Sequence, residues 1–180
     1  VTSIGEFAFS SCSGLTEITI PESVVSIGEM AFYNCSGLRE IIVPEGVTSI
    51  GSSAFSNCSS LTKISFPTSL ASIGSQICFN CTALKEITVS KCVVENAGLS
   101  YHFSTGAISS VCLQNDVTAI PEFYFLSCNN LTSVTIPNSV TDIGRFAFSG
   151  CVSLTEINIP NSATSIGEAA FHNCTSLVSI

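Results

Sequence analysis

The stretch Ser26-Ile-Gly-Glu-Met-Ala-Phe-Tyr-Asn-Cys-Ser-Gly-Leu-Arg-Glu-Ile-Ile-Val-Pro44 decides the fold, because versions of it recur along almost the whole chain. Its cysteine, Cys35, has equivalents 23 residues before and after it, at Cys12 and Cys58. The full cysteine column is Cys12, Cys35, Cys58, Cys81, Cys128, Cys151 and Cys174. A fixed period of about 20 to 50 residues is typical of a solenoid, in which each repeat buries its apolar side against its neighbours.

The repeats divide residues 1–180 into about eight copies of 23 residues. The fifth copy, 93–116, is irregular and one residue longer, and the last copy is cut short. We therefore expect a single solenoid domain over the whole sequence. Because the chain has no initiating Met and begins and ends inside a repeat, we also expect it to be an excerpt of a longer protein.

Each repeat contains a strand and a turn region. The pattern Leu-x-x-Ile-x-Ile-Pro, as at 15–21, alternates apolar and polar residues as a half-buried strand does. The following proline ends the strand because it cannot donate a ladder hydrogen bond. We expect one parallel sheet from residues near 16–20, 39–43, 62–66, 85–89, 109–113, 132–136 and 155–159.

The remainder of each repeat carries a glycine followed by Glu-x-Ala-Phe-x-x-Cys. In the second repeat, Ala31, Phe32 and Cys35 have helical spacing, so we expect one short helical turn there. The glycine recurs in register at 5, 28, 51, 74, 144 and 167, which indicates either a positive φ or a close backbone approach.

The pattern Ile-Gly-x-x-Ala-Phe-x-x-Cys-x-x-Leu-x-x-Ile-x-Ile-Pro, nearly complete at 27–44 and 143–160, resembles the BspA-like class of leucine-rich repeats. The resemblance implies an α/β repeat solenoid, right-handed and curved, with a parallel concave sheet and short helical turns on the convex side. It further implies a cell-surface or extracellular protein that acts in adhesion and protein binding. The class has no common catalytic residues.

The charge composition limits which classes of partner the chain can bind. Charged residues make up 10% of the chain, and the net charge is −8 with only five Lys and Arg. This balance argues against a nucleic-acid partner and favours a basic partner or none. The sequence has no long apolar run and no secretory signal segment, so we expect no membrane insertion by this segment.

Several motifs resemble metal, redox or catalytic sites, but their positions in the repeat favour a structural role. Cys78 and Cys81 form a C-x-x-C pair, but both fall in columns that point into the core, so we expect neither a metal nor a redox site. Stacked cysteines project in parallel, which favours a ladder of reduced, buried thiols over disulfides. Only two histidines are present and no nucleophile motif occurs, so we expect no enzyme and no cofactor.

The irregular fifth repeat loses the Ile-Gly pair, the Ala-Phe pair and the cysteine. One interpretation is drift in a single repeat, repacked locally by Tyr101 and Phe103. The other is a bulge that presents Tyr101 and His102 to a partner.

The outward positions of the predicted strands are the main candidate site. In the first four strands they collect nearly all the charge of the predicted sheet, together with an outward isoleucine. We expect a concave binding face formed by Glu17, Arg39, Glu40, Ile42, Lys63, Ser65, Lys85, Glu86 and Thr88.

These features predict a non-catalytic module that recognises a protein, such as a host or extracellular-matrix protein, through this face. The alternative is a structural spacer that holds another domain and binds nothing. Uncapped ends of a solenoid also expose apolar surface and strand edges, so we expect self-association through the ends.

Overall fold

The computed structural model describes residues 1–104 and 106–180 and divides them into two compact units. Unit 1 comprises Val1–Lys85 with Tyr101–Ser104, and unit 2 comprises Glu86–Ser100 with Thr105–Ile180. Each unit is a solenoid of parallel strands, as the 23-residue period predicts.

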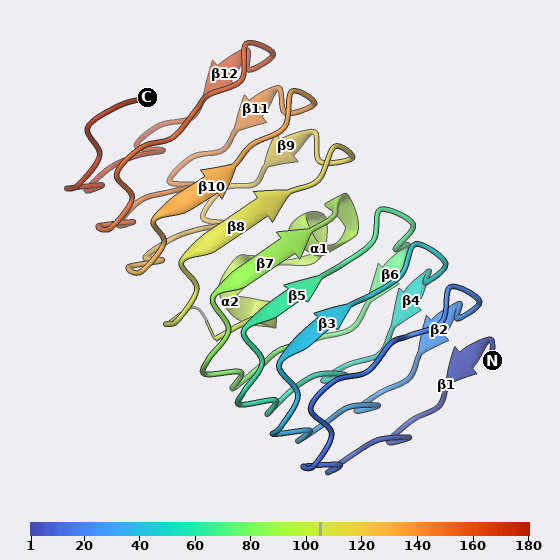
Figure 1. Ribbon diagram of the computed structural model, residues 1–180. Coiled ribbons are helices and arrows are strands. Elements are labelled where there is room, and N and C mark those ends of the chain that lie inside the picture. Colours follow the sequence, from blue (N-terminus) through green and yellow to red (C-terminus); the bar gives the residue numbers. More distant parts are fainter. Residues whose placement is uncertain (105) are drawn as a thin grey trace. The chain divides into compact units, whose positions relative to one another are not determined.

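Unit 1 contains two rows of parallel strands, which belong to separate sheets and are labelled in Figure 1. The first row is a parallel sheet of two-residue strands in the order β1 (Ser3–Ile4), β2 (Ser26–Ile27), β4 (Ser49–Ile50) and β6 (Ser72–Ile73). In the second row, β3 (Glu40–Ile42) pairs in parallel with β5 (Lys63–Ser65).

Unit 2 repeats this arrangement. Its longer strands are β7 (Glu86–Val89), β8 (Ser110–Leu113) and β10 (Ser133–Thr135), which pair in that order. Its short strands are β9 (Ala119–Ile120), β11 (Asp142–Ile143) and β12 (Ser165–Ile166), again all parallel.

The predicted strands are confirmed at five of their seven positions, β3, β5, β7, β8 and β10. Residues 16–20 form no strand, and Glu156 makes only an isolated bridge to Ser179. The row of Ser-Ile strands was not predicted, because two residues are too few to show alternation. Burial of the isoleucine nevertheless explains its recurrence, since Ile27 is 2% exposed and Ile50 is 3% exposed.

The expected helical turn is a chain of β-turns in the structure. In the second repeat, the Ala31 amide donates to the Gly28 carbonyl (3.4 Å) and the Cys35 amide to the Phe32 carbonyl (3.2 Å). The third residue of each turn, Met30 or Asn34, has a positive φ (51° and 59°), as type II turns require. The alternate amides point to the next repeat, where Asn34 donates to the Ser56 carbonyl (2.8 Å).

This turn geometry explains the asparagines of the repeat. The left-handed conformation is costly for most side chains, and asparagine tolerates it better than most residues. The second positive-φ column is Ser11, Asn34, Asn57, Asn80, Ser127, Gly150 and Asn173. The asparagines also extend the stacking, since the Asn80 side-chain amide donates to the Asn57 side-chain oxygen at 2.7 Å.

The recurring glycine is required by a close backbone approach and not by a positive φ. A Cβ built on Gly51 would lie 2.4 Å from the Glu29 backbone nitrogen in the preceding repeat. The same contact would be 2.6 Å from Gly28 to Glu6. Two chain segments therefore pass so close at this column that no side chain fits between them.

The core is built from stacked identical residues. In unit 1 the Phe9 and Phe32 rings are parallel with centroids 5.1 Å apart, and Phe55 continues the stack at 5.4 Å. The thiol of Cys58 is fully buried and donates to the Phe32 carbonyl of the preceding repeat at 3.2 Å. The Cys35 thiol makes the equivalent bond to the Phe9 carbonyl at 3.0 Å.

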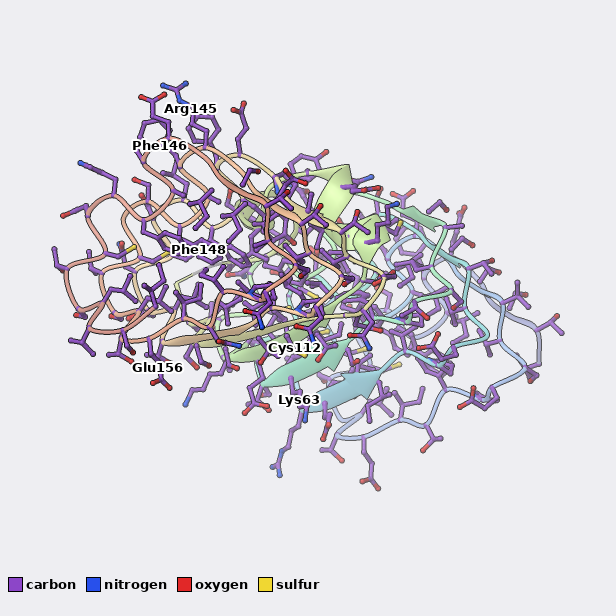
Figure 2. All side chains as sticks on the ribbon, turned by 90° about the horizontal axis from the view of Figure 1, so that it is seen from above. Lys63, Cys112, Arg145, Phe146, Phe148 and Glu156 are labelled. Carbon is purple, nitrogen blue, oxygen red and sulfur yellow. The ribbon has the colours of Figure 1, made fainter. Side chains whose placement is uncertain are left out.

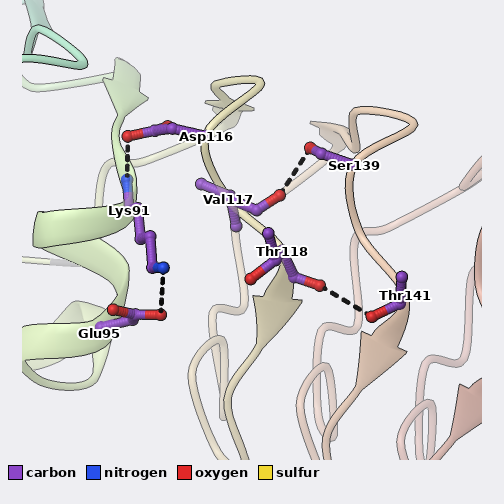
Figure 3. Close-up of polar contacts among 7 residues, drawn as sticks. All are labelled: Lys91, Glu95, Asp116, Val117, Thr118, Ser139 and Thr141. Atoms are coloured by element: carbon purple, nitrogen blue, oxygen red, sulfur yellow. Dashed lines mark hydrogen bonds and ion pairs between the residues drawn. The ribbon is translucent and has the colours of Figure 1, made fainter.

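The irregular repeat replaces part of the turn region with two short helices, α1 (Lys91–Asn96) and α2 (Leu99–His102). In unit 2, the backbone amide of Lys91 donates to the Asp116 carboxylate at 3.0 Å, and its ammonium lies 3.7 Å from Glu95 (Figure 3). Neither helix, nor any other in the part of the chain described, is long and apolar enough to cross a membrane.

Regular stacking resumes next to the irregular repeat. The Ser139 hydroxyl donates to the Val117 carbonyl at 2.6 Å, and the Thr141 hydroxyl to the Thr118 carbonyl at 3.3 Å (Figure 3). Tyr124 occupies the column that holds alanine in neighbouring repeats and is 2% exposed. Its large ring therefore fills part of the core beside the repeat that has lost its own Ala-Phe pair.

The first test concerns the glycine column. We expect Gly51→Ala to lower the free energy of unfolding by about 1–3 kcal/mol, because the new methyl group overlaps backbone atoms that cannot move independently. Gly5→Ala is the matched control, since a Cβ there meets nothing within 4 Å. Urea denaturation of both variants measures the difference, and equal midpoints would contradict the close approach.

The second test concerns the thiols. All ten cysteines are free in the structure, and Cys12 is the exposed one. We expect Cys12 to react first with a thiol-specific reagent, and not the half-buried Cys112 that its outward strand position would favour. The buried thiols are Cys35, Cys58, Cys78, Cys81, Cys128 and Cys151. These should react only after denaturation; a low count in both states would indicate disulfides.

The third test concerns alkaline pH. Burial raises the pKa of the Cys35 thiol from 9.0 to about 11, with the neighbouring Cys58 adding to the shift. Because the folded pKa is the higher one, the stabilisation is complete below pH 9 and is lost as the pH rises toward 11. Denaturation midpoints should fall across this window, and less steeply in Cys35→Ser. Equal slopes would show that Cys35 titrates normally.

Candidate functional site

The candidate site lies on the outward side of the longer strands in unit 1. Register places Glu40 opposite Lys63 and Ile42 opposite Ser65 on β3 and β5. Along β3, the residue between Glu40 and Ile42 points inward: Ile41 is 1% exposed. Alternation along a strand therefore separates a buried apolar row from an outward row that is free to carry other chemistry.

The outward row combines charge with exposed apolar surface. Ile42 is 63% exposed, although most isoleucines of the repeat are buried. The Lys63 ammonium lies 4.0 Å from the Glu40 carboxylate, and both side chains are about half exposed. An ion pair this exposed adds little to stability, typically up to about 1 kcal/mol. Figure 2 shows Lys63 projecting from its strand.

An open hollow of about 450 Å³ lies beside this row. Residues 16–20 and Glu22 form one part of its lining, and Arg39, Glu40 and Ile42 form another. The Arg39 backbone anchors the two sides, because its amide donates to the Thr16 carbonyl at 3.3 Å. The structure thus brings Glu17, Arg39, Glu40 and Ile42 together around one depression.

The predicted face is divided between the two units. We define the strand-face patch as the outward residues of unit 1, namely Glu17, Arg39, Glu40, Ile42, Lys63, Ser65 and Lys85. Glu86 and Thr88 lie on β7 of unit 2, where Glu86 is exposed and Thr88 is half-buried.

The irregular repeat places its two candidate residues in different environments. Tyr101 is 51% exposed, whereas His102 is 0% exposed. Burial lowers the pKa of His102 to about 4, so its imidazole is neutral at physiological pH. The neighbouring Phe103 packs edge-on against Phe66 at 6.1 Å. Only Tyr101 of this pair therefore offers its side chain to the surface.

No cluster of three or more potential metal ligands occurs among residues 1–104 and 106–180. Cys78 and Cys81 are both buried in the core, in the columns that the repeat assigns to them. The C-x-x-C spacing is thus a product of two stacked columns.

One surface feature in unit 2 is absent from the sequence prediction. Phe123 and Phe146 stack in parallel 5.6 Å apart, and Phe123 is 41% exposed. The Arg145 guanidinium lies 4.7 Å from the Phe146 ring centre and donates to Glu168 at 3.0 Å. In Figure 2, Arg145 and Phe146 stand on the outer side, whereas Phe148 lies inside. The exposed Phe123 and the half-buried Phe146 both sit at positive-φ positions, which the repeat pattern alone does not reveal.

The family model for the BspA type leucine rich repeat region matches residues 1–98 and 99–180. No curated protein matches the chain.

Two solved structures are similar. The crystal structure of a leucine rich repeat protein from T. pallidum is 30% identical, with a TM-score of 0.64, and the match covers 86% of this chain and 72% of that one. A leucine-rich repeat protein from Bacteroides ovatus is 27% identical, with a TM-score of 0.50, and covers 100% of this chain and 64% of that one.

Members of this repeat class are often surface proteins that mediate protein interactions, and they are typically not enzymes. The match extends over both units and includes the irregular repeat. The chain belongs to the BspA-type leucine-rich repeat family.

Proposed function

We propose that this chain is a non-catalytic protein-binding module of a cell-surface or secreted protein, and that the strand-face patch of unit 1 contacts the partner. The observation that carries the proposal is Ile42, an isoleucine 63% exposed on a paired strand, beside the Glu40–Lys63 pair. Family membership supports the class of function, because these repeats often mediate protein interactions.

A rigid backbone favours binding at the strand-face patch. The backbone of β3 is fixed by its ladder to β5, so the side chains it presents lose little conformational freedom on binding. The patch offers both signs of charge around an apolar centre, as protein interfaces commonly do. Arginine and apolar residues near the centre of such an interface carry most of the affinity, whereas rim charges mainly affect the association rate.

Glu86 and Thr88 on β7 remain proposed contact residues for the same partner class, which includes host and extracellular-matrix proteins. Tyr101 is the alternative contact, since its ring is half exposed and lies outside the strand rows. A rigid spacer that binds nothing is the competing function. If the chain is a spacer, it binds no protein partner, and no surface substitution changes a binding affinity.

The test compares outward residues of the two units. Against a protein partner captured by the chain, we expect Arg39→Ala and Ile42→Ser each to weaken binding by at least about 1 kcal/mol. Thr132→Ala and Thr155→Ala are matched controls, because both threonines are outward and exposed and belong to unit 2. Isothermal calorimetry or surface plasmon resonance measures the affinities.

All four variants should keep the thermal stability of the parent, since none removes a buried contact. Equal losses from both units would move the site away from the patch. Binding abolished only by Tyr101→Ala would assign it to the irregular repeat. Failure of every preparation to capture a protein would favour the spacer.

A further inference from the structure

The hollow beside β3 contains an unpaired strand edge. In a parallel ladder, alternate residues direct both backbone groups toward the same neighbouring strand. The Val43 amide donates to the Ser65 carbonyl at 3.0 Å, so Ile41 and Val43 face β5. The amide and carbonyl of Ile42 consequently face the other way, toward residues 16–20.

Residues 16–20 do not complete the ladder on that side. They meet the second repeat through the Arg39 amide and the Thr16 carbonyl, and within the described ranges no backbone hydrogen bond joins 17–20 to Glu40–Ile42. The hollow of about 450 Å³ lies along this gap. Unpaired strand edges are the templates on which extended peptides add as a further strand.

The lining of the hollow determines which peptide fits. Glu17, Glu22 and Glu40 contribute three carboxylates against the single guanidinium of Arg39. Ile18, Ile20 and Ile42 contribute apolar surface. Because side chains alternate along a strand, an added strand meets the outward carboxylates with one set of its side chains and the apolar wall with the other.

We propose that β3 captures an extended segment of a partner protein by strand addition, and that the segment alternates basic with apolar residues. This inference rests on the proposed function and specifies its partner class. A second hollow of about 460 Å³ lies in unit 2 beside β10, but Glu156 is the one charged residue in its lining. It therefore provides an internal comparison with similar volume and little charge.

Amide hydrogen exchange of the full 180-residue chain, read by NMR, tests the edge directly. In the free protein we expect the Ile42 amide to exchange rapidly, and the Val43 amide, which has a partner at 3.0 Å, to be protected. The probe is a short synthetic peptide that alternates lysine and valine. Its binding should slow exchange at Ile42 at least about tenfold, because the amide gains a backbone partner.

Matched probes and variants isolate the cause. A peptide of the same composition with its lysines in one block, and a peptide with glutamate in place of lysine, should bind more weakly. Glu17→Gln combined with Glu40→Gln should weaken binding of the alternating peptide about fivefold, since the two changes remove two of the carboxylates that pair with its lysines. Glu156→Gln in unit 2 should leave its affinity unchanged.

Three results would overturn strand addition. Protection of Ile42 in the dilute free protein would show that residues 16–20 already occupy the edge. Protection that appears only at high protein concentration would assign the edge to a second copy of the chain. Peptide binding that leaves the Ile42 amide unprotected would show that charge attraction, and not backbone pairing, holds the peptide. If Arg39→Ala still weakens a protein partner in any of these cases, the proposed function stands while this mode of binding fails.

Discussion

Everything in this structure depends on backbone hydrogen bonds between one repeat and the next. In the turn region the amides alternate between closing a turn within their own repeat and donating to a carbonyl of the following repeat, as Cys35 and Asn34 illustrate. Polar backbone groups that stay unpaired in a core are costly, so this alternation satisfies the chain without a helix. Within each unit the regular repeats are consequently joined by a ladder of backbone hydrogen bonds, and side chains fill the space that this ladder leaves.

The side chains follow from that ladder. Successive repeats are held at a strand-like separation, so Gly28 and Gly51 lie where a methyl group would meet backbone atoms of the preceding repeat. The same spacing brings Phe9 and Phe32 to ring-stacking distance. A cysteine suits the remaining narrow position, because its small thiol packs as an apolar group and still donates to a carbonyl, as Cys58 does.

The parts of the fold that repeat can be predicted from the sequence, whereas the parts that depend on single local conformations cannot. The register of Ile41 with Ile64 could be predicted, because the 23-residue period and the strand alternation are both visible in the sequence. The series of β-turns at Met30 and Asn34 could not be predicted, since apolar spacing cannot distinguish a helical turn from successive β-turns.

The irregular repeat was equally beyond prediction. Nothing in the sequence shows that His102 is buried while Tyr101 is exposed, because both lie where the pattern fails. The hollow beside β3 also escapes prediction, since residues 16–20 have the same apolar pattern as the strands that do pair.

The ladder also has an evolutionary consequence. Most contacts between repeats are made by backbone atoms and by columns of equivalent residues, so a duplicated 23-residue block meets the same partners as its parent. Unequal recombination joins part of one repeat to part of another. The product is a complete repeat whenever the two breakpoints lie at equivalent positions of their repeats. The array can therefore lengthen or shorten without inventing a new contact. Selection is left to act on the few outward positions, such as Ile42, that the stack does not constrain.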